Sequence, residues 1–166
     1  ITFNSLNDGT YSGETVTVTD AVGNTASIIM ADFVIDSVSP TITITSATVS
    51  DGSASNDESI SLTFTSSEVT TNFVESDITV TGGSLSNFSA TSSTVYTATF
   101  MPSEAGATTI DVLGGVFTDQ AGNSNTASSQ FNWTFDNSSA ELSDVSLVSN
   151  NTTTTLAKVG DTITLS

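Results

Sequence analysis

Residues 118–123 read Thr-Asp-Gln-Ala-Gly-Asn, and residues 19–24 read Thr-Asp-Ala-Val-Gly-Asn. Their Asp residues are 119 − 20 = 99 positions apart. Asp36 and Asp136 each directly follow an apolar residue, Ile35 and Phe135, at a spacing of 136 − 36 = 100. A fixed period is the strongest sign of repeat architecture, because each copy is expected to form the same structural unit. The sequence therefore predicts an array of units that recur about every hundred residues.

The chain is strongly acidic and has almost no cations. Its 166 residues hold 18 Asp and Glu against one Lys and no Arg, for a formal charge of −17. Nucleic-acid binding needs Lys and Arg to displace counterions, and an anionic membrane surface repels such a chain. We therefore expect neither nucleic-acid nor membrane contact from this segment. A composition rich in Ser, Thr, Asn and Asp favours an extracellular or cell-surface location.

Alternating apolar and polar residues predict an all-β fold. The pattern is clearest in residues 41–45, 60–65 and 95–100, where β-branched residues alternate with Thr and Ser. Clusters of Gly, Asn and Asp separate such stretches. We expect seven strands in the middle of the chain, at residues 41–46, 59–65, 77–81, 85–90, 94–100, 108–113 and 127–135. Seven short antiparallel strands in about a hundred residues are typical of an immunoglobulin-like sandwich.

One face of each expected strand supplies the predicted core. The inward set is Ile42, Ile44, Ile60, Leu62, Phe64, Val80, Phe88, Tyr96, Ala98, Phe100, Ile110, Val112, Phe131, Trp133 and Phe135. Phe and Trp take the place of the disulfide that many such domains use, since the chain has no Cys.

The flanks match parts of the same unit. Three residues near the start correspond to residues late in the complete unit: Phe3 to Phe100, Gly9 to Gly106 and Asp20 to Asp119. Residues 1–37 therefore match the last strands of a unit. Residues 138–166 match the first strands, and residues 38–137 form the complete unit. We predict tandem immunoglobulin-like sandwiches, one complete and two partial.

The middle unit resembles the bacterial immunoglobulin-like repeats of giant surface adhesins and other secreted repeat proteins. The matching features are the linker 36–41, the segments 64–68 and 77–83, the turn 117–123 and the closing Asp136. This resemblance implies a stalk that holds a functional tip away from the cell. It also implies that calcium stiffens the joints between repeats.

Catalysis is not expected. The chain contains neither His nor Cys, and its one Lys lies in a partial unit, so no Ser or Thr has a basic partner that could activate it. Paired carboxylates can hydrolyse glycosides, but they need a cleft that a narrow sandwich rarely provides. We therefore interpret the acidic residues as surface groups or metal ligands, and the protein as non-enzymatic.

Calcium is the expected cofactor, because it binds six to eight oxygen atoms from carboxylates, carbonyls and Asn. Sandwich topology places alternate loops at the same pole. At the joint before the complete unit this gathers Asp8, Asp36, Glu68 and Asp119, with Asp77 nearby. At the joint after it we expect Asp51, Asp57, Glu58, Glu104, Asp136 and Asn137.

A second interpretation of the acidic turns needs no metal. Asp20 and Asp119 each open an Asp-x-x-Gly-Asn turn, in which the Asp side chain bonds its own backbone and Gly accepts a positive φ. That chemistry alone explains the motif, so for any single acid the structural role stands beside the metal role.

Three functions remain open at this point. The first is the stiff stalk of an adhesin, whose partners are neighbouring repeats of the same protein. The second is a self-assembling fibre, in which strands from other copies complete the partial units. The third is a module that binds glycan or protein through the loops at one pole, although few aromatic residues lie in those loops.

Overall fold

The computed structural model describes residues 6–141, 147–150, 152–153 and 156–165. The chain divides into two compact units, Ile1–Asp136 and Asn137–Ser166, which are described separately. Phe3 lies outside the described residues, as do parts of the expected unit 138–166. The predicted boundaries at residues 37 and 137 therefore remain a prediction.

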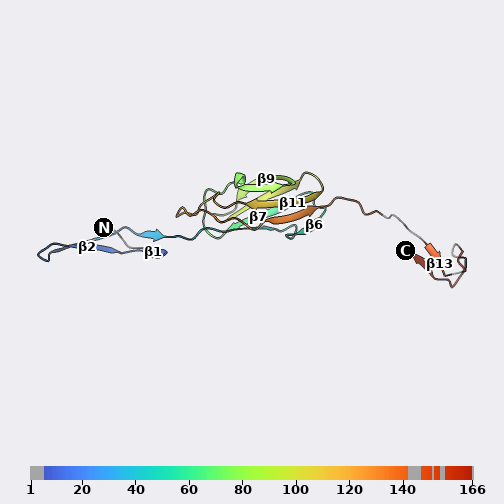
Figure 1. Cartoon of the computed structure of the whole chain (residues 1–166), viewed down its shortest axis with the longest axis horizontal. Helices are drawn as coiled ribbons and strands as arrows, with labels where there is room; N and C mark the ends of the chain where they lie inside the picture. The colour runs from blue at the N-terminus through green and yellow to red at the C-terminus, as the bar shows by residue number, and fades with distance from the viewer. Residues whose placement is uncertain (1–5, 142–146, 151, 154–155, 166) are drawn as a thin grey trace. The chain divides into compact units, whose positions relative to one another are not determined.

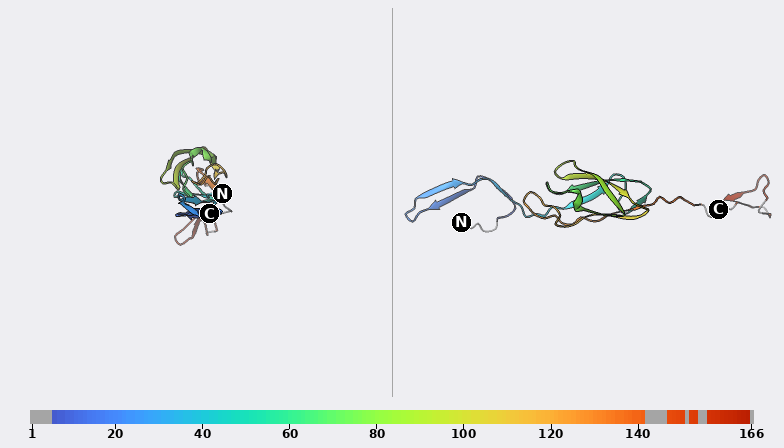
Figure 2. Two further views of the ribbon diagram at one scale, coloured as in Figure 1. Left: turned by 90° about the vertical axis from the view of Figure 1, so that its left-hand side faces the viewer. Right: turned by 90° about the horizontal axis from the view of Figure 1, so that it is seen from above.

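Two four-stranded sheets form a sandwich within the first unit (Figure 1 and Figure 2). The first sheet has the order β5 (Ile42–Ser46), β7 (Ile60–Ser66), β10 (Val95–Pro102) and β9 (Gly83–Ala90). The second has the order β6 (Ser53–Ser55), β12 (Phe131–Phe135), β11 (Gly106–Val112) and β8 (Ile78–Thr81). This strand order is that of an immunoglobulin-like sandwich, so the predicted fold class is confirmed.

The period-2 pattern explains the register of these sheets. Ile44 of β5 lies opposite Phe64 of β7, and Phe64 lies opposite Tyr96 of β10. In β7, residues with inward side chains are buried while most of those between them are exposed or half-buried. A shift of one residue would turn this apolar set toward solvent, which fixes the register.

Two differences from the predicted strands have local causes. The expected strands did not include β6, a three-residue strand that pairs parallel with β12. The last strand begins at Phe131 rather than at residue 127, because Ser128 bonds the end of β11 through its own groups. Its amide donates to Val112 O and its hydroxyl accepts from Val112 N, at 2.9 and 3.0 Å.

The core is aromatic and fully enclosed. Phe64, Phe100, Trp133 and Ile110 are each at most 1% exposed, so Trp133 packs inside the sandwich and offers no stacking surface to a glycan. Of the predicted core, Ile44, Val80 and Phe88 are only partly buried. The core also contains Phe73, Ile78 and Phe117, which the alternation did not predict.

The missed aromatic residues lie outside the strands. Phe73 follows β7 in the loop toward the 3-10 helix η1 (Glu75–Asp77), and Phe117 follows β11. Their ring centroids are 5.1 Å apart, and Phe73 also contacts Phe64, Phe88 and Tyr96. This cluster anchors two long loops at one end of the sandwich.

The residues before the sandwich form two short antiparallel ladders. One pairs β1 (Gly9–Tyr11) with β4 (Phe33–Ile35), and the other pairs β2 (Thr15–Thr19) with β3 (Thr25–Ile29). In the second unit, β13 (Leu147–Ser149) pairs with β14 (Ile163–Leu165). In the described part of the chain, no helix is long and apolar enough to cross a membrane.

Candidate metal centre

Three loops meet at the end of the sandwich where β5 begins, as the topology predicts. Thr70, in the loop between β7 and β8, donates its amide to Ser93 O in the loop between β9 and β10, at 3.0 Å. Thr70 also forms an isolated bridge with Asp119, in the loop between β11 and β12. Glu68 and Asp119 thus lie at the same pole.

Asp36 of the linker joins them to form a carboxylate cluster, which we define as Asp36, Glu68 and Asp119. One carboxylate oxygen from each lies within 4.8 Å of the other two. Asp36 and Glu68 are half-buried and Asp119 is buried. The three residues come from positions as far apart as 36 and 119, so tertiary structure brings them together.

Hydrogen bonds hold Asp119 in its ionised form. Its Oδ1 accepts from the amides of Gly122 and Asn123 at 2.7 and 2.9 Å, and its Oδ2 accepts from Asn123 Nδ2 at 2.9 Å. Burial opposes ionisation, but the bonds from the Asn123 side chain and from the backbone outweigh it and lower the pKa of Asp119. Its charge is therefore built into the turn.

Glu68 is the residue most affected by the gathering of like charges. Burial raises the pKa of its carboxyl, and the neighbouring charges of Asp36 and Asp119 raise it further. Ionisation of Glu68 is thus opposed by burial and by repulsion from the two neighbouring carboxylates. A cation bound among them would relieve that repulsion.

The linker is fixed at Asp36 by two further bonds. Val38 donates its amide to Asp36 Oδ1 at 3.0 Å, and Asn123 Nδ2 donates to the Asp36 carbonyl at 3.0 Å. Asn123 therefore bonds both Asp119 and Asp36. The sequence placed Asn123 only in a turn, and nothing in the motif indicated its second partner 87 residues away.

Asn72 joins the loops that carry Glu68 and Asp119, and Tyr96 of β10 fixes the first of them. Asn72 Oδ1 accepts from the Thr118 amide at 3.1 Å, and its Nδ2 donates to Thr118 Oγ1 at 3.2 Å. Tyr96 Oη donates to Thr70 O at 2.9 Å in the buried interior. Neither role could be predicted from the sequence, because a loop Asn and a strand Tyr carry no local sign of such partners.

The other residues expected at this joint lie apart from the cluster. Asp8 Oδ2 accepts from Ser37 Oγ at 2.9 Å, so it bonds the linker without joining the three carboxylates. Asp77 Oδ2 accepts from the Val74 amide at 2.9 Å and caps η1.

Two of the acids expected at the following joint accept hydrogen bonds from neighbouring residues. Asp51 Oδ1 accepts from the Asn132 amide at 2.7 Å, and Asp57 Oδ2 accepts from Ser55 Oγ at 2.7 Å. Among the residues that the structure describes, only the first cluster brings three or more potential ligand residues within 4.8 Å of one another. The structure therefore does not gather Asp51, Asp57, Glu58, Glu104 and Asp136, and their role as ligands remains a prediction.

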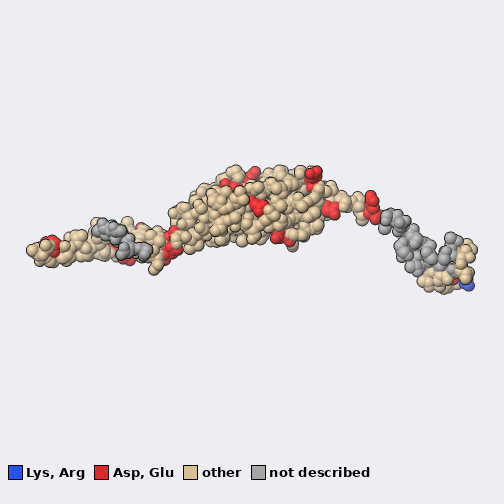
Figure 3. All heavy atoms as spheres, in the orientation of Figure 1, with Lys and Arg blue, Asp and Glu red and all other residues tan. Residues whose placement is uncertain are grey.

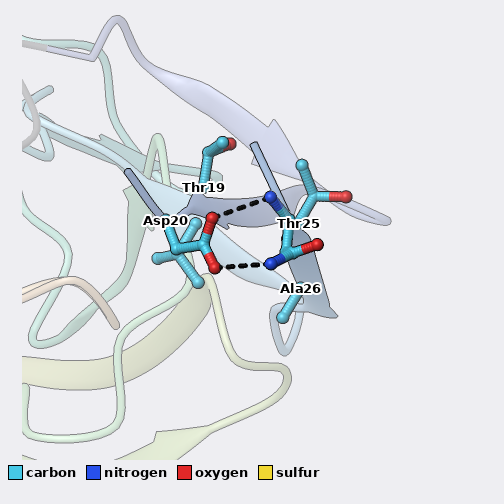
Figure 4. A pocket seen from close by; sticks show the side chains of 6 residues that line it. Thr19, Asp20, Thr25 and Ala26 are labelled. Atoms are coloured by element: carbon cyan, nitrogen blue, oxygen red, sulfur yellow. Dashed lines mark hydrogen bonds between the residues drawn. The ribbon is translucent and has the colours of Figure 1, made fainter. Parts of the chain in front are cut away.

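Asp20 forms the same turn without a cluster around it. Its Oδ1 accepts from the amides of Val22 and Asn24 at 3.0 and 2.8 Å, and its Oδ2 accepts from Asn24 Nδ2 at 2.7 Å. These bonds, the Asn24 side chain first, lower the pKa of Asp20. Figure 4 shows Asp20 beside Thr19, Thr25 and Ala26, where the lining contains no second acid.

Comparison with known proteins identifies the sandwich. The family model of the bacterial Ig-like domain matches residues 36–135, which is more than half of the chain. Searches of the curated proteins and of the solved structures found no match. Domains of the matching family are typically non-enzymatic modules of the surface-repeat type and are often extracellular. With the strand order, the core and the matched residues in agreement, this chain belongs to the bacterial Ig-like domain family.

Proposed function

We propose that the chain is a non-enzymatic spacer of an extracellular adhesin, built from tandem Ig-like repeats whose joint binds calcium. The observation that carries this proposal is the carboxylate cluster, since it combines a linker residue, Asp36, with two loops of the following domain. A cation held there would tie the linker to the end of the sandwich.

The donor set suits a hard cation. Three carboxylates supply at least three oxygen atoms within a small region, and backbone carbonyls and water would complete the six to eight that calcium prefers. The chain has one Lys, at position 158, and no Arg, so no side-chain cation within the first unit can neutralise the cluster. Figure 3 shows how sparse the cationic side chains are.

The expected effect is modest and concerns the joint more than the fold. Extracellular calcium sites have dissociation constants of about 10⁻⁴–10⁻³ M. Occupancy at ten times that value stabilises the folded state by about 1.4 kcal/mol, because the ligand binds that state alone. Calcium would therefore restrict the linker without being required for folding of the sandwich.

The spacer role rests on the repeat and on the linker. The same β-pairing recurs on both sides of the linker, as expected of modules in series. Pro40 is fully buried at the start of the domain, and its carbonyl accepts from the Thr126 amide at 3.0 Å. Only residues 37–39 therefore separate Asp36 from a fixed point of the sandwich.

Thermal unfolding with calcium and with chelator tests the proposal. We expect calcium to raise the melting temperature of the sandwich, and Asp36→Asn to remove that increase. Asp20→Asn is the matched control, because Asp20 also accepts the amide two residues ahead of it, as Asp36 does, but lies away from the cluster. Identical melting curves with calcium and with chelator, or an equal loss in both variants, would overturn the calcium proposal.

A further inference from the structure

We propose that β6 and β12 form a mechanical clamp that holds the sandwich against tension along the chain, and that the Asp51 side chain supplies its first hydrogen bond. The inference rests on the proposed spacer function, because a module in series with others transmits any pull on the array. The contacts involved need no metal, so an experiment in chelator separates this proposal from that of a calcium site.

The first and last strands of the sandwich start at the same end of it. Pro40 lies just before β5, and its carbonyl accepts from the amide of Thr126, which lies just before β12, at 3.0 Å. Tension along the chain enters ahead of β5 and leaves after β12. It therefore pulls these two parts of the domain in opposite directions along their strands.

A surface hollow separates β5 from the beginning of β12. It has a volume of about 170 Å³, and Ile42, Ile44 and Phe131 contribute to its lining. The next strand of the chain, β6, closes the gap by pairing parallel with residues 133–135 of β12. β6 is thus the strand through which the first part of the domain is bonded to its last strand.

The Asp51 carboxylate begins the ladder between β6 and β12. Its Oδ1 accepts from the Asn132 amide at 2.7 Å, at a place where a backbone carbonyl would continue a parallel ladder. On the same residue, Asn132 O accepts from the Gly52 amide at 2.7 Å. Hydrogen bonds to a carboxylate are stronger than those between neutral groups. This contact gives Asp51 a mechanical role that needs no metal.

The far end of the ladder is also fixed. Ser55 O accepts from the Asp136 amide at 2.9 Å. The Ser55 hydroxyl accepts from Trp133 Nε1 at 3.1 Å and donates to Asp57 Oδ2 at 2.7 Å. Since Trp133 is only 1% exposed, its bond ties β6 to the core. Side-chain bonds therefore strengthen a ladder of only three residue pairs at both of its ends.

The direction of the pull decides how these bonds break. When two parallel strands are pulled from opposite ends, all bonds of the ladder share the load and must break nearly together. When both strands are pulled from the same end, the bonds break one after another, each under the full load. The connectivity of the sandwich selects the first case, so the short β6 ladder can resist a large force.

Single-molecule pulling of the full chain at constant force, in chelator, tests the direction. The chain has no Cys, so paired substitutions provide unique attachment points. Ser39→Cys with Asn137→Cys loads the sandwich as the chain itself would. Asn56→Cys with Asn137→Cys pulls β6 and β12 from the same end, because Asn56 and Asn137 follow the bonded pair Ser55 and Asp136. We expect the first geometry to withstand the higher force, and equal forces would overturn the proposal.

Variants in the first geometry assign the effect to Asp51. Asp51→Ala should raise the unfolding rate at a given force about tenfold, because it removes a hydrogen bond that breaks at the transition state. Asp51→Asn keeps an Oδ1 acceptor and should restore part of the resistance. Asp77→Ala is the matched control, since Asp77 also accepts a backbone amide, that of Val74, but lies on neither terminal strand. The proposal is wrong if Asp51→Ala leaves the rate unchanged, or if Asp77→Ala raises it equally.

Discussion

The turn at Asp20 and the turn at Asp119 have similar internal hydrogen bonds but different surroundings. In each, the Asp carboxylate accepts hydrogen bonds from two backbone amides and one Asn side chain. The turn glycines, Gly23 and Gly122, have similar φ values of 94° and 97°. Asp20 is exposed, whereas Asp119 is 7% exposed and lies beside two other acids. The motif therefore specifies the turn, and tertiary structure alone creates the cluster.

The residues that flank the two turns differ more strongly. Residues 15–29 form a regular antiparallel hairpin, β2 and β3. Their counterparts, residues 114–128, form a loop in which Phe117 is buried. Asn125 holds this loop: its Oδ1 accepts from the amides of Val116 and Phe117, and its Nδ2 donates to the carbonyls of Leu113 and Thr126. The hairpin has Ala26 at the equivalent position, which can make no such bonds.

The largest expected effect separates the buried loop from the exposed hairpin. Phe117→Ala should destabilise the sandwich by about 3–5 kcal/mol, because it leaves a cavity within the aromatic cluster. Val18→Ala, the counterpart change at a 58% exposed position, should alter stability by less than about 0.5 kcal/mol. Urea unfolding followed by Trp133 fluorescence measures both. Similar costs at the two positions would contradict the contrast in burial.

A smaller effect is expected at the Asn that fixes the loop. Asn125→Ala should cost about 2–3 kcal/mol, since it leaves buried backbone groups without partners. The reverse change, Ala26→Asn, should leave the stability of the sandwich unaltered. Chemical denaturation of the two variants checks this, and a neutral Asn125→Ala would mean that packing of Phe117 alone sets the loop.

The smallest effect concerns pH and the Glu68 carboxyl. Its folded pKa is raised above 4.5, so without calcium the cost of its ionisation is fully present above the folded pKa. That cost disappears as the pH falls toward 4.5. The lowered pKa of Asp119 acts oppositely: its stabilisation is present above 3.8 and is lost as the pH falls through its folded pKa.

Glu68→Gln isolates the first of these two terms. In chelator, wild type should gain stability relative to this variant as the pH falls from neutrality toward 4.5, because only wild type is relieved of a charge at position 68. Below that range, both proteins should lose the Asp119 contribution alike. The measurement is the melting temperature of both proteins in chelator at each pH. If the two curves of melting temperature against pH stay parallel, ionisation of Glu68 does not affect stability.

The sequence predicted those parts of the fold that depend on local pattern. The alternation in residues 60–65 predicted β7 and its buried face, and the Asp-x-x-Gly-Asn motif predicted both turns. Phe73 and Phe117 were not predicted to be core residues, because loops have no hydrophobic period from which burial can be inferred. Topology brought Asp36, Glu68 and Asp119 to one pole as predicted, but it could not show that Asp8 would bond Ser37 instead.

The most direct test of a calcium-binding joint is an NMR titration of the full chain with calcium. The account predicts saturable shifts of the amides of Val38, Glu68, Gly122 and Asn123, with half-saturation at about 10⁻⁴–10⁻³ M, while those of residues 20–24 stay in place. Equal shifts at both turns would show nonspecific attraction of a cation to acidic loops. Unchanged amides at the cluster would contradict the central claim.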